Sequence, residues 1–173
     1  MSLAHLARYA AVQRDAGRFS LDTQVPGALR RYGDPAFDSL LASLGAEYAR
    51  RTSIDLIPTY SFVRIYRRGQ TLAAHRDRKE CEHSATVHIA SPGTTAWPIH
   101  VKDRSGRPTA IDLEPGDSLI YRGAELMHWR EPAPTDWYLQ VFLHYVDASG
   151  PYADLRLDGR AMLGVERGTN DLD

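Results

Sequence analysis

Residues 60–77 carry the sequence Tyr-Ser-Phe-Val-Arg-Ile-Tyr-Arg-Arg-Gly-Gln-Thr-Leu-Ala-Ala-His-Arg-Asp. Its first seven residues alternate in character with the period of a β-strand. Arg68-Gly69-Gln70 then interrupts the alternation and predicts a turn. The stretch ends on His75 and Asp77, and side chains at i and i+2 of an extended segment share a face. We therefore predict a strand that returns through a turn and presents a histidine beside a carboxylate.

Further strand-like segments follow this stretch, each bounded by turn residues. The turns recur about every 8–12 residues, a spacing typical of antiparallel sandwiches and barrels. We predict a mainly β protein with its helices packed outside the β-structure. The expected strands cover residues 83–90, 97–101, 109–113, 118–121 and 137–146.

The first fifty residues read as helical. One apolar stripe runs through residues 3–11 at i, i+3, i+4 spacing, and a second through residues 37–48. Asp34-Pro35 predicts the start of the second helix, because an acidic N-cap precedes proline at the first helical position. A basic stretch with glycines, residues 27–34, lies between the two helices, and Pro58 is expected to interrupt the pattern just before the first strand.

The chain of 173 residues has the length of one domain. We divide it into helical support over residues 1–52, a β core over 54–147, and a polar segment over 148–173 that forms a partly ordered tail or a flap. The sequence carries no signal for an oligomeric state.

Composition excludes several classes of function. Lys and Arg number 21 against 22 Asp and Glu, so no basic excess points to nucleic acid. No apolar run approaches the roughly 18 residues of a membrane span, and the charged N-terminus does not read as a secretory signal. The single cysteine, Cys81, excludes an internal disulfide and a cysteine-based zinc cluster. We therefore expect a cytoplasmic protein, without a membrane or nucleic-acid partner.

His75, Asp77 and the distant His128 form the candidate metal site. Two imidazoles and one carboxylate on one face of a metal leave three positions open, which suits non-haem Fe(II). A His-x-Asp pair alone is a weak signal, and its plain alternative is a charged hairpin in water.

Additional residues in a fixed order strengthen the metal interpretation. The order is Tyr66-x-x-Gly69-x-x-x-x-x-His75-x-Asp77, then Thr86, Pro115-Gly116-Asp117, and His128 with Pro132 four residues on. This pattern resembles the 2-oxoglutarate/Fe(II)-dependent dioxygenases, above all their compact prolyl-hydroxylase-like branch and its uncharacterised bacterial members. The resemblance implies a double-stranded β-helix, a jelly-roll or cupin-like barrel, with two or three supporting α-helices.

The resemblance also implies roles for residues of this chain. His75, Asp77 and His128 would hold Fe(II), and Tyr66 would face a pocket for 2-oxoglutarate, which reacts together with O2. The family usually places a basic residue nine or ten positions after the distal histidine, but Trp137 and Tyr138 stand there. The distal carboxylate of 2-oxoglutarate therefore needs another cation. Arg64 is the first candidate, because it shares a strand face with Tyr66, and Arg130 and Arg122 are the next.

Four further residues are pocket candidates on predicted strands: His88, Thr86, Tyr121 and Gln140. His144 shares a face with Gln140. We interpret Cys81 as a packed thiol, since no arrangement around it resembles a Cys-His catalytic set. Beyond the metal ligands, the sequence offers no catalytic residue.

Two classes of function remain open. The first is an oxygenase that hydroxylates an unactivated C–H bond of a small molecule, amino acid or peptide side chain. The second is a cupin-like barrel that uses its metal as a hydrolase or isomerase, or as a sensor without turnover. The missing cation after His128 keeps the second class open.

Overall fold

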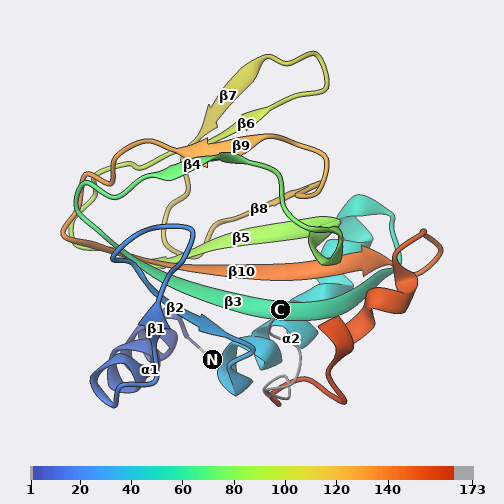
Figure 1. Cartoon of the computed structure of the whole chain (residues 1–173), viewed down its shortest axis with the longest axis horizontal. Coiled ribbons are helices and arrows are strands. Elements are labelled where there is room, and N and C mark those ends of the chain that lie inside the picture. The colour runs from blue at the N-terminus through green and yellow to red at the C-terminus, as the bar shows by residue number, and fades with distance from the viewer. Residues whose placement is uncertain (1, 166–173) are drawn as a thin grey trace.

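The computed structural model describes residues 2–165, which form two facing antiparallel β-sheets (Figure 1). The six-stranded sheet has the order β1 (Ser20–Leu21), β2 (Leu29–Tyr32), β3 (Leu56–Arg67), β10 (Trp137–Asp147), β5 (His83–Ala90) and β8 (Ser118–Tyr121). The four-stranded sheet has the order β4 (Leu72–His75), β9 (His128–Arg130), β6 (Ile99–Lys102) and β7 (Pro108–Ile111). This arrangement is a double-stranded β-helix, and the predicted fold class is confirmed.

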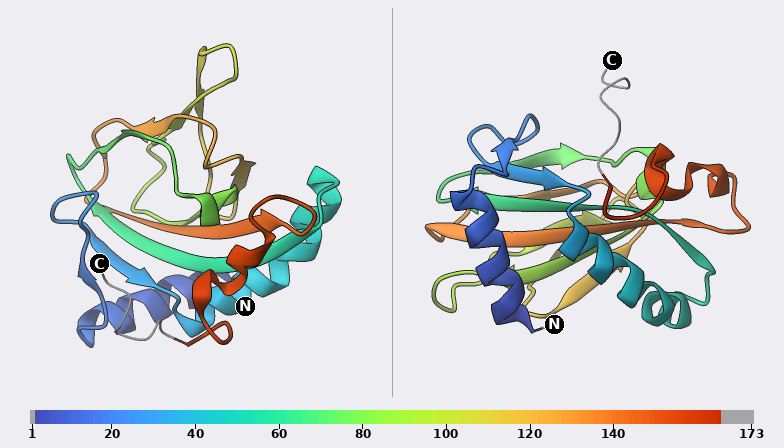
Figure 2. Two further views of the ribbon diagram at one scale, coloured as in Figure 1. Left: turned by 45° about the vertical axis from the view of Figure 1, so that its right-hand side comes forward. Right: turned by 90° about the horizontal axis from the view of Figure 1, so that it is seen from below.

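Two α-helices cover the outer face of the six-stranded sheet (Figure 2). Helix α1 (Leu3–Asp15) packs on β5, and α2 (Pro35–Thr52) packs on β3 and β10. As predicted, Asp34 caps α2, accepting a hydrogen bond from the Ala36 backbone N–H at 3.0 Å. Two short 3₁₀ segments, η1 (Lys79–Cys81) and η2 (Ala153–Gly159), complete the described chain. None of the helices within residues 2–165 has the length and apolar character to cross a membrane.

Strands β3 and β10 separate two kinds of side chain. Their apolar residues, Val63 and Ile65 on β3 and Val141 and Leu143 on β10, join Phe37 and the other buried residues of the helices in the main hydrophobic core. The residues between them point the other way, toward the four-stranded sheet, and many of them are polar or aromatic. The main core therefore lies outside the barrel, and the barrel interior is free to hold a site.

The expectation of an all-helical N-terminal region is wrong for two short segments. Residues 20–21 and 29–32 form β1 and β2, and β2 pairs with β3 in the register Leu29 opposite Ile65. Glycines with positive φ, Gly27 at 80° and Gly33 at 61°, turn the chain at each end of β2. Such short strands depend on the sheet edge to which they pair, so their own sequence predicts them poorly.

Pro58 does not interrupt the strand, contrary to expectation. It lies within β3 opposite Tyr145, where the register between β3 and β10 shifts. A proline cannot donate to the ladder of backbone hydrogen bonds, and an irregular register is where a strand accommodates it.

Residues 148–165 of the polar C-terminal segment are held against the fold by polar contacts. Arg160 lies buried with its Nη1 2.6 Å from Asp38 Oδ2 on α2, and its Nη2 donates to the Thr59 carbonyl at 2.9 Å. Asp158 also accepts a hydrogen bond from Arg78 Nη2 at 2.6 Å. Residues 148–165 are thus an ordered part of the fold, whereas residues 166–173 of the predicted tail lie outside the described residues.

Candidate metal centre

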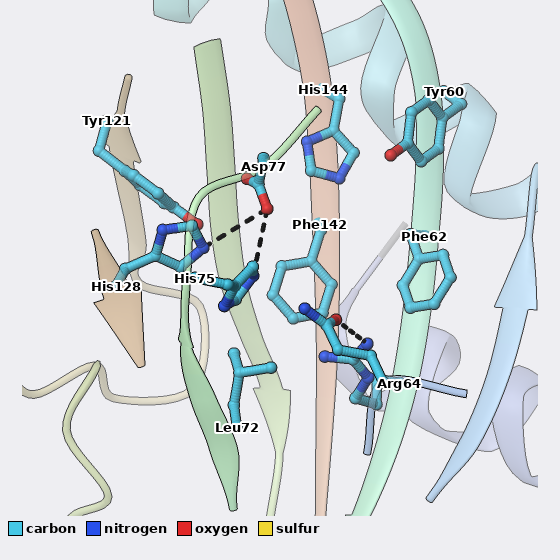
Figure 3. A pocket seen from close by; sticks show the side chains of 11 residues that line it. Tyr60, Phe62, Arg64, Leu72, His75, Asp77, Tyr121, His128, Phe142 and His144 are labelled. Atoms are coloured by element: carbon cyan, nitrogen blue, oxygen red, sulfur yellow. Dashed lines mark hydrogen bonds and ion pairs between the residues drawn. The ribbon is translucent and has the colours of Figure 1, made fainter. Parts of the chain in front are cut away.

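The pairing of β4 with β9 places His75 opposite His128. Asp77 follows β4 by two residues, and its carboxylate lies beside both imidazoles (Figure 3). Asp77 Oδ1 is 3.3 Å from His75 Nε2 and 3.5 Å from His128 Nε2. One ligand atom from each residue lies within 4.8 Å of the other two. The structure therefore brings the three predicted residues together, from segments about fifty positions apart.

Backbone carbonyls orient both histidines in the same way. His75 Nδ1 lies 2.9 Å from the Ala73 carbonyl, and His128 Nδ1 lies 2.9 Å from the Leu126 carbonyl. A carbonyl only accepts hydrogen bonds, so each Nδ1 carries a proton that it donates. In the neutral imidazole this tautomer leaves the Nε2 lone pair free, and Nε2 is the atom that faces Asp77. Both rings are therefore arranged as metal ligands.

The electrostatics of the trio favour a cation between its members. Burial alone would raise the pKa of Asp77, but hydrogen bonds from His128 and His75 outweigh it and hold that pKa well below its usual range. Burial alone would lower the pKa of His75, but its hydrogen bonds to Asp77 and to the Ala73 carbonyl outweigh burial, so the pKa of His75 is raised. An ionised carboxylate thus favours positive charge at the two Nε2 atoms, and a divalent ion supplies such charge.

Gly123 allows the backbone to pass close behind Asp77. Its carbonyl accepts a hydrogen bond from the Asp77 backbone N–H at 3.0 Å. A Cβ at this position would collide with Asp77 Oδ2 and Ser84 Oγ and would lie 2.8 Å from the Cys81 carbonyl oxygen. The position of the carboxylate therefore depends on the absence of a side chain at residue 123.

Gly123→Ala is expected to weaken Fe(II) binding by roughly 10- to 100-fold, the usual cost of disturbing a group that supports a metal ligand. The added methyl group must push Asp77 away from His75 and His128. Anaerobic titration with Fe(II) measures the change. Gly45→Ala on α2 is the control, because Gly45 has no positive φ and an added methyl group would meet only Tyr145 Cε1, at 3.4 Å. Equal Fe(II) affinities in Gly123→Ala and the wild type would contradict this role.

A cavity of about 100 Å³ lies beside the trio (Figure 3). Besides the trio itself, its walls are mainly aromatic, with Arg64 as the cationic group. Of the predicted pocket residues it includes Tyr121, whose ring meets that of His128 edge-on at 4.9 Å between centroids. His88, Thr86 and Gln140 are not among its lining residues, and neither are Tyr66 and Arg130. The other lining residues are Gln24, Tyr60, Phe62, Leu72, Phe142 and His144.

Arg64 already has an anionic partner. Its Nε lies 2.6 Å from Asp22 Oδ2, and both side chains are buried. Nη1 donates to the Tyr66 hydroxyl at 2.9 Å, and Nη2 donates to Gln24 Oε1 at 2.8 Å. Arg64 and Tyr66 are therefore linked as the shared strand face predicts, but the charge of Arg64 is balanced by Asp22.

Arg130 is buried without such a partner. It lies two residues after His128 on β9 and is 1% exposed. Its guanidinium donates to the Trp97 carbonyl and to Gln140 Oε1, and Gln140 in turn donates to Thr86. Among residues 2–165, no carboxylate forms an ion pair with Arg130. A buried cation without a counter-charge is costly, which makes this position suited to an anionic ligand.

Two buried polar atoms beside Arg130 have no hydrogen-bond partner within the described chain, the Tyr138 hydroxyl and His88 Nε2. The guanidinium carbon of Arg130 lies 5.2 Å from the centroid of the Tyr138 ring, and the His88 ring stacks on Tyr138 at 4.1 Å. Burial raises the pKa of Tyr138 to about 12, so its hydroxyl keeps its proton and can donate. Arg130 and Tyr138 thus form a set of buried donors. His88 is not a further donor, because its Nδ1 donates to the Leu113 carbonyl and burial lowers its pKa, so Nε2 of the neutral ring can only accept a hydrogen bond.

The remaining sequence candidates are not part of this set. Arg122 is paired with Glu125, whose Oε1 lies 3.1 Å from the Arg122 Nε. Cys81 is a free cysteine and is buried. The sequence analysis missed Asp22, because the segment that contains it was predicted to be helical. It noted Tyr138 only as one of the two residues at the positions after His128 where the family usually has a basic residue.

His144, which lines the cavity, is expected to make the stability of the metal-free protein depend on pH. Burial lowers its pKa to about 4. Since an unfolded histidine titrates near 6.5, its contribution to stability is complete above that pH and is lost as pH falls toward 4. We expect the free energy of unfolding of the metal-free protein to fall by about 3 kcal/mol over this range from His144 alone. Denaturation at pH 7 and pH 4 measures the loss, which should be smaller in His144→Gln; an equal loss in both proteins would contradict the expectation.

Neither a family model nor a curated protein matches this sequence. Solved structures do match in fold. A Pseudomonas putida prolyl-4-hydroxylase superposes with a TM-score of 0.69 and 16% identity over 84% of this chain and 85% of that chain. A prolyl hydroxylase from Trichoplax adhaerens, in complex with a peptide fragment of hypoxia inducible factor, superposes with a TM-score of 0.66 and 14% identity over 84% and 78% of the two chains.

A third match carries the family name itself. An oxidoreductase of the 2OG-Fe(II) oxygenase family from Burkholderia pseudomallei has a TM-score of 0.61 and 14% identity, over 81% of this chain and 78% of that chain. Identities this low establish the fold and leave the chemistry to the residues of the site. This chain therefore has the double-stranded β-helix fold of the 2-oxoglutarate/Fe(II) oxygenases, in the form that prolyl hydroxylases adopt.

Proposed function

We propose that the protein is an Fe(II)- and 2-oxoglutarate-dependent dioxygenase. The observation that carries the proposal is the convergence of His75, Asp77 and His128, with both Nε2 atoms directed at one carboxylate oxygen. Two nitrogens and one carboxylate are the ligand set of non-haem Fe(II) oxygenases, and they leave positions for cosubstrate and O2. The shared fold with 2-oxoglutarate/Fe(II) oxygenases supports the same assignment.

We assign the distal carboxylate of 2-oxoglutarate to Arg130 in preference to Arg64. Arg130 lacks a carboxylate partner among the described residues, whereas Arg64 is paired with Asp22. His128 and Arg130 are two residues apart on one strand face, which separates them by about 7 Å. A five-carbon dicarboxylate that is chelated at the metal can span such a distance. The neutral Tyr138 hydroxyl would donate a further hydrogen bond to the same carboxylate. Tyr66 would lie beside the bound 2-oxoglutarate, held in position by the hydrogen bond that it accepts from Arg64.

The bound iron, with 2-oxoglutarate and O2, would supply the oxidising power to hydroxylate an unactivated C–H bond. The chain's own residues have simpler tasks. The Ala73 and Leu126 carbonyls hold the two imidazoles in one tautomer, and Gly123 leaves room for the carboxylate of Asp77. Phe62, Phe142 and Tyr121 form apolar walls that limit water beside the metal.

We infer that the substrate is a small molecule, an amino acid or a peptide side chain. The cavity is small and lined by aromatic side chains, which suits one side chain or a compact metabolite better than a large ligand. The Trichoplax prolyl hydroxylase, which shares the fold, was solved with a peptide fragment. A cytoplasmic location stays a prediction from the sequence.

Anaerobic titration of the Fe(II)-loaded protein with 2-oxoglutarate tests the proposal. We expect a weak visible charge-transfer band that saturates as the chelate forms and is absent in His128→Ala. Pyruvate, which lacks the distal carboxylate, should produce the band only at much higher concentration. Iron bound without any band would contradict the dioxygenase assignment and favour the metal hydrolase, isomerase or sensor.

A further inference from the structure

A second group of potential ligands lies on the other side of Asp77. One atom each from Asp77, Cys81 and His144 lies within 4.8 Å of the other two. Cys81 ends η1, and His144 is on β10. Figure 3 shows Asp77 between His75 and His128 on one side and His144 on the other. The two groups therefore share a single carboxylate.

Ser84 orients the ligands of this second group. Its hydroxyl donates to Asp77 Oδ2 at 3.1 Å and lies 2.9 Å from His144 Nδ1. Because a hydroxyl has one proton to give and the ionised carboxylate can only accept, Nδ1 of His144 acts as the donor to Ser84. The lone pair of a neutral His144 is then on Nε2. This is the arrangement that a histidine ligand requires.

Cys81 adds a soft ligand to the group. Its Sγ lies 2.9 Å from the Tyr60 hydroxyl, and Tyr60 and His144 both line the cavity beside the trio. Cys81 itself is 2% exposed and does not line the cavity, so Tyr60 and His144 connect it to that space. Thiolate, imidazole and carboxylate together form a ligand set preferred by Zn²⁺, whereas the thiol-free first trio suits Fe(II).

We propose that Asp77, Cys81 and His144 form a second metal position that takes Zn²⁺ or a similar thiol-binding divalent ion. Binding displaces the thiol proton of Cys81 to solvent, so the site gains a thiolate without any redox step. Because Asp77 belongs to both positions and two cations would lie close together, Zn²⁺ at the second position weakens Fe(II) binding at the first, and Fe(II) weakens Zn²⁺ equally. The inference rests on these residues and not on the proposed oxygenase activity.

Cobalt is the probe for this position, since Co²⁺ replaces Zn²⁺ and shows a near-ultraviolet charge-transfer band when a thiolate binds it. The chain has one cysteine, so any such band comes from Cys81. We expect the band in the wild type and in the double variant His75→Ala/His128→Ala, which disables the first position. It should disappear in Cys81→Ser and on addition of one equivalent of Zn²⁺, and weaken strongly in His144→Gln.

The controls separate this inference from the proposed function. His100→Ala removes a histidine whose ring stacks on Trp129 and that belongs to neither group, and it should leave the band unchanged. Cys81→Ser should still bind Fe(II) and 2-oxoglutarate, with its fold checked by circular dichroism. If wild-type protein saturated with Co²⁺ shows no thiolate band, or if Zn²⁺ leaves the Fe(II) affinity unaltered, the second position is refuted, whatever the outcome of the 2-oxoglutarate titration.

Discussion

Asp77→Ala is expected to weaken Fe(II) binding by more than about 100-fold, because loss of a residue that merely supports a metal ligand already costs roughly 10- to 100-fold. Asp77 supplies the only negative charge among the three ligands, and its oxygen lies within 3.5 Å of both Nε2 atoms. Without it, a divalent ion would meet two neutral imidazoles. Anaerobic Fe(II) titration, with metal analysis after dialysis, measures the loss.

Two comparisons make the result specific. His128→Ala should lose Fe(II) to a similar extent, since it removes a ligand from the opposite strand of the β4–β9 pair. His100→Ala removes a histidine from the neighbouring strand β6, where His100 pairs with Trp129, and should bind Fe(II) as the wild type does. Unaltered Fe(II) affinity in Asp77→Ala, with the fold intact, would mean that the metal lies elsewhere.

Arg130→Met should abolish tight binding of 2-oxoglutarate while leaving Fe(II) binding intact. Removing one partner of a buried charge pair costs about 2–5 kcal/mol, which corresponds to at least about 30-fold in affinity. The substitution removes a buried cation that no described carboxylate balances, but it also takes the donor away from the Trp97 carbonyl and from Gln140 Oε1. These two effects oppose each other, so we expect the stability of the ligand-free variant to stay close to that of the wild type. The chelate band measures affinity, and thermal unfolding measures stability.

Arg64→Met is the matched control for this result. It leaves Asp22 buried and unpaired, so we expect a loss of about 3–5 kcal/mol in the free energy of unfolding. Its 2-oxoglutarate affinity should stay closer to that of the wild type than the affinity of Arg130→Met. The opposite ranking of the two affinities would assign the anchor to Arg64.

Much of the fold was predictable because local sequence and tertiary structure agree over most of the chain. The predicted strands over residues 83–90 and 118–121 match β5 and β8, and Asp34-Pro35 starts α2 as expected. β1 and β2 were not predictable, since their few residues become strands only by pairing at the edge of β3. Pro58 was misleading because the register shift opposite it is a property of two strands together.

The candidate site, like the fold, could be predicted from the sequence only in part. His75 and Asp77 could be paired from sequence because side chains at i and i+2 share a face. The choice between Arg64 and Arg130 could not be made, because it depends on which arginine meets a carboxylate, and Asp22 approaches Arg64 from 42 positions away. The link between Cys81 and His144 was equally inaccessible, since only the folded chain brings η1 against β10.

The alternation along β3 and β10 has a consequence for how this protein can change over evolutionary time. Residues such as Val63 and Val141 stabilise the molecule from the helix side, and the residues between them face the cavity. Phe62 or Phe142 can therefore be exchanged to admit a different substrate with little effect on the main core. New specificities can therefore arise by replacement of the cavity-facing residues of β3 and β10, while the core-facing residues of the same strands continue to stabilise the fold.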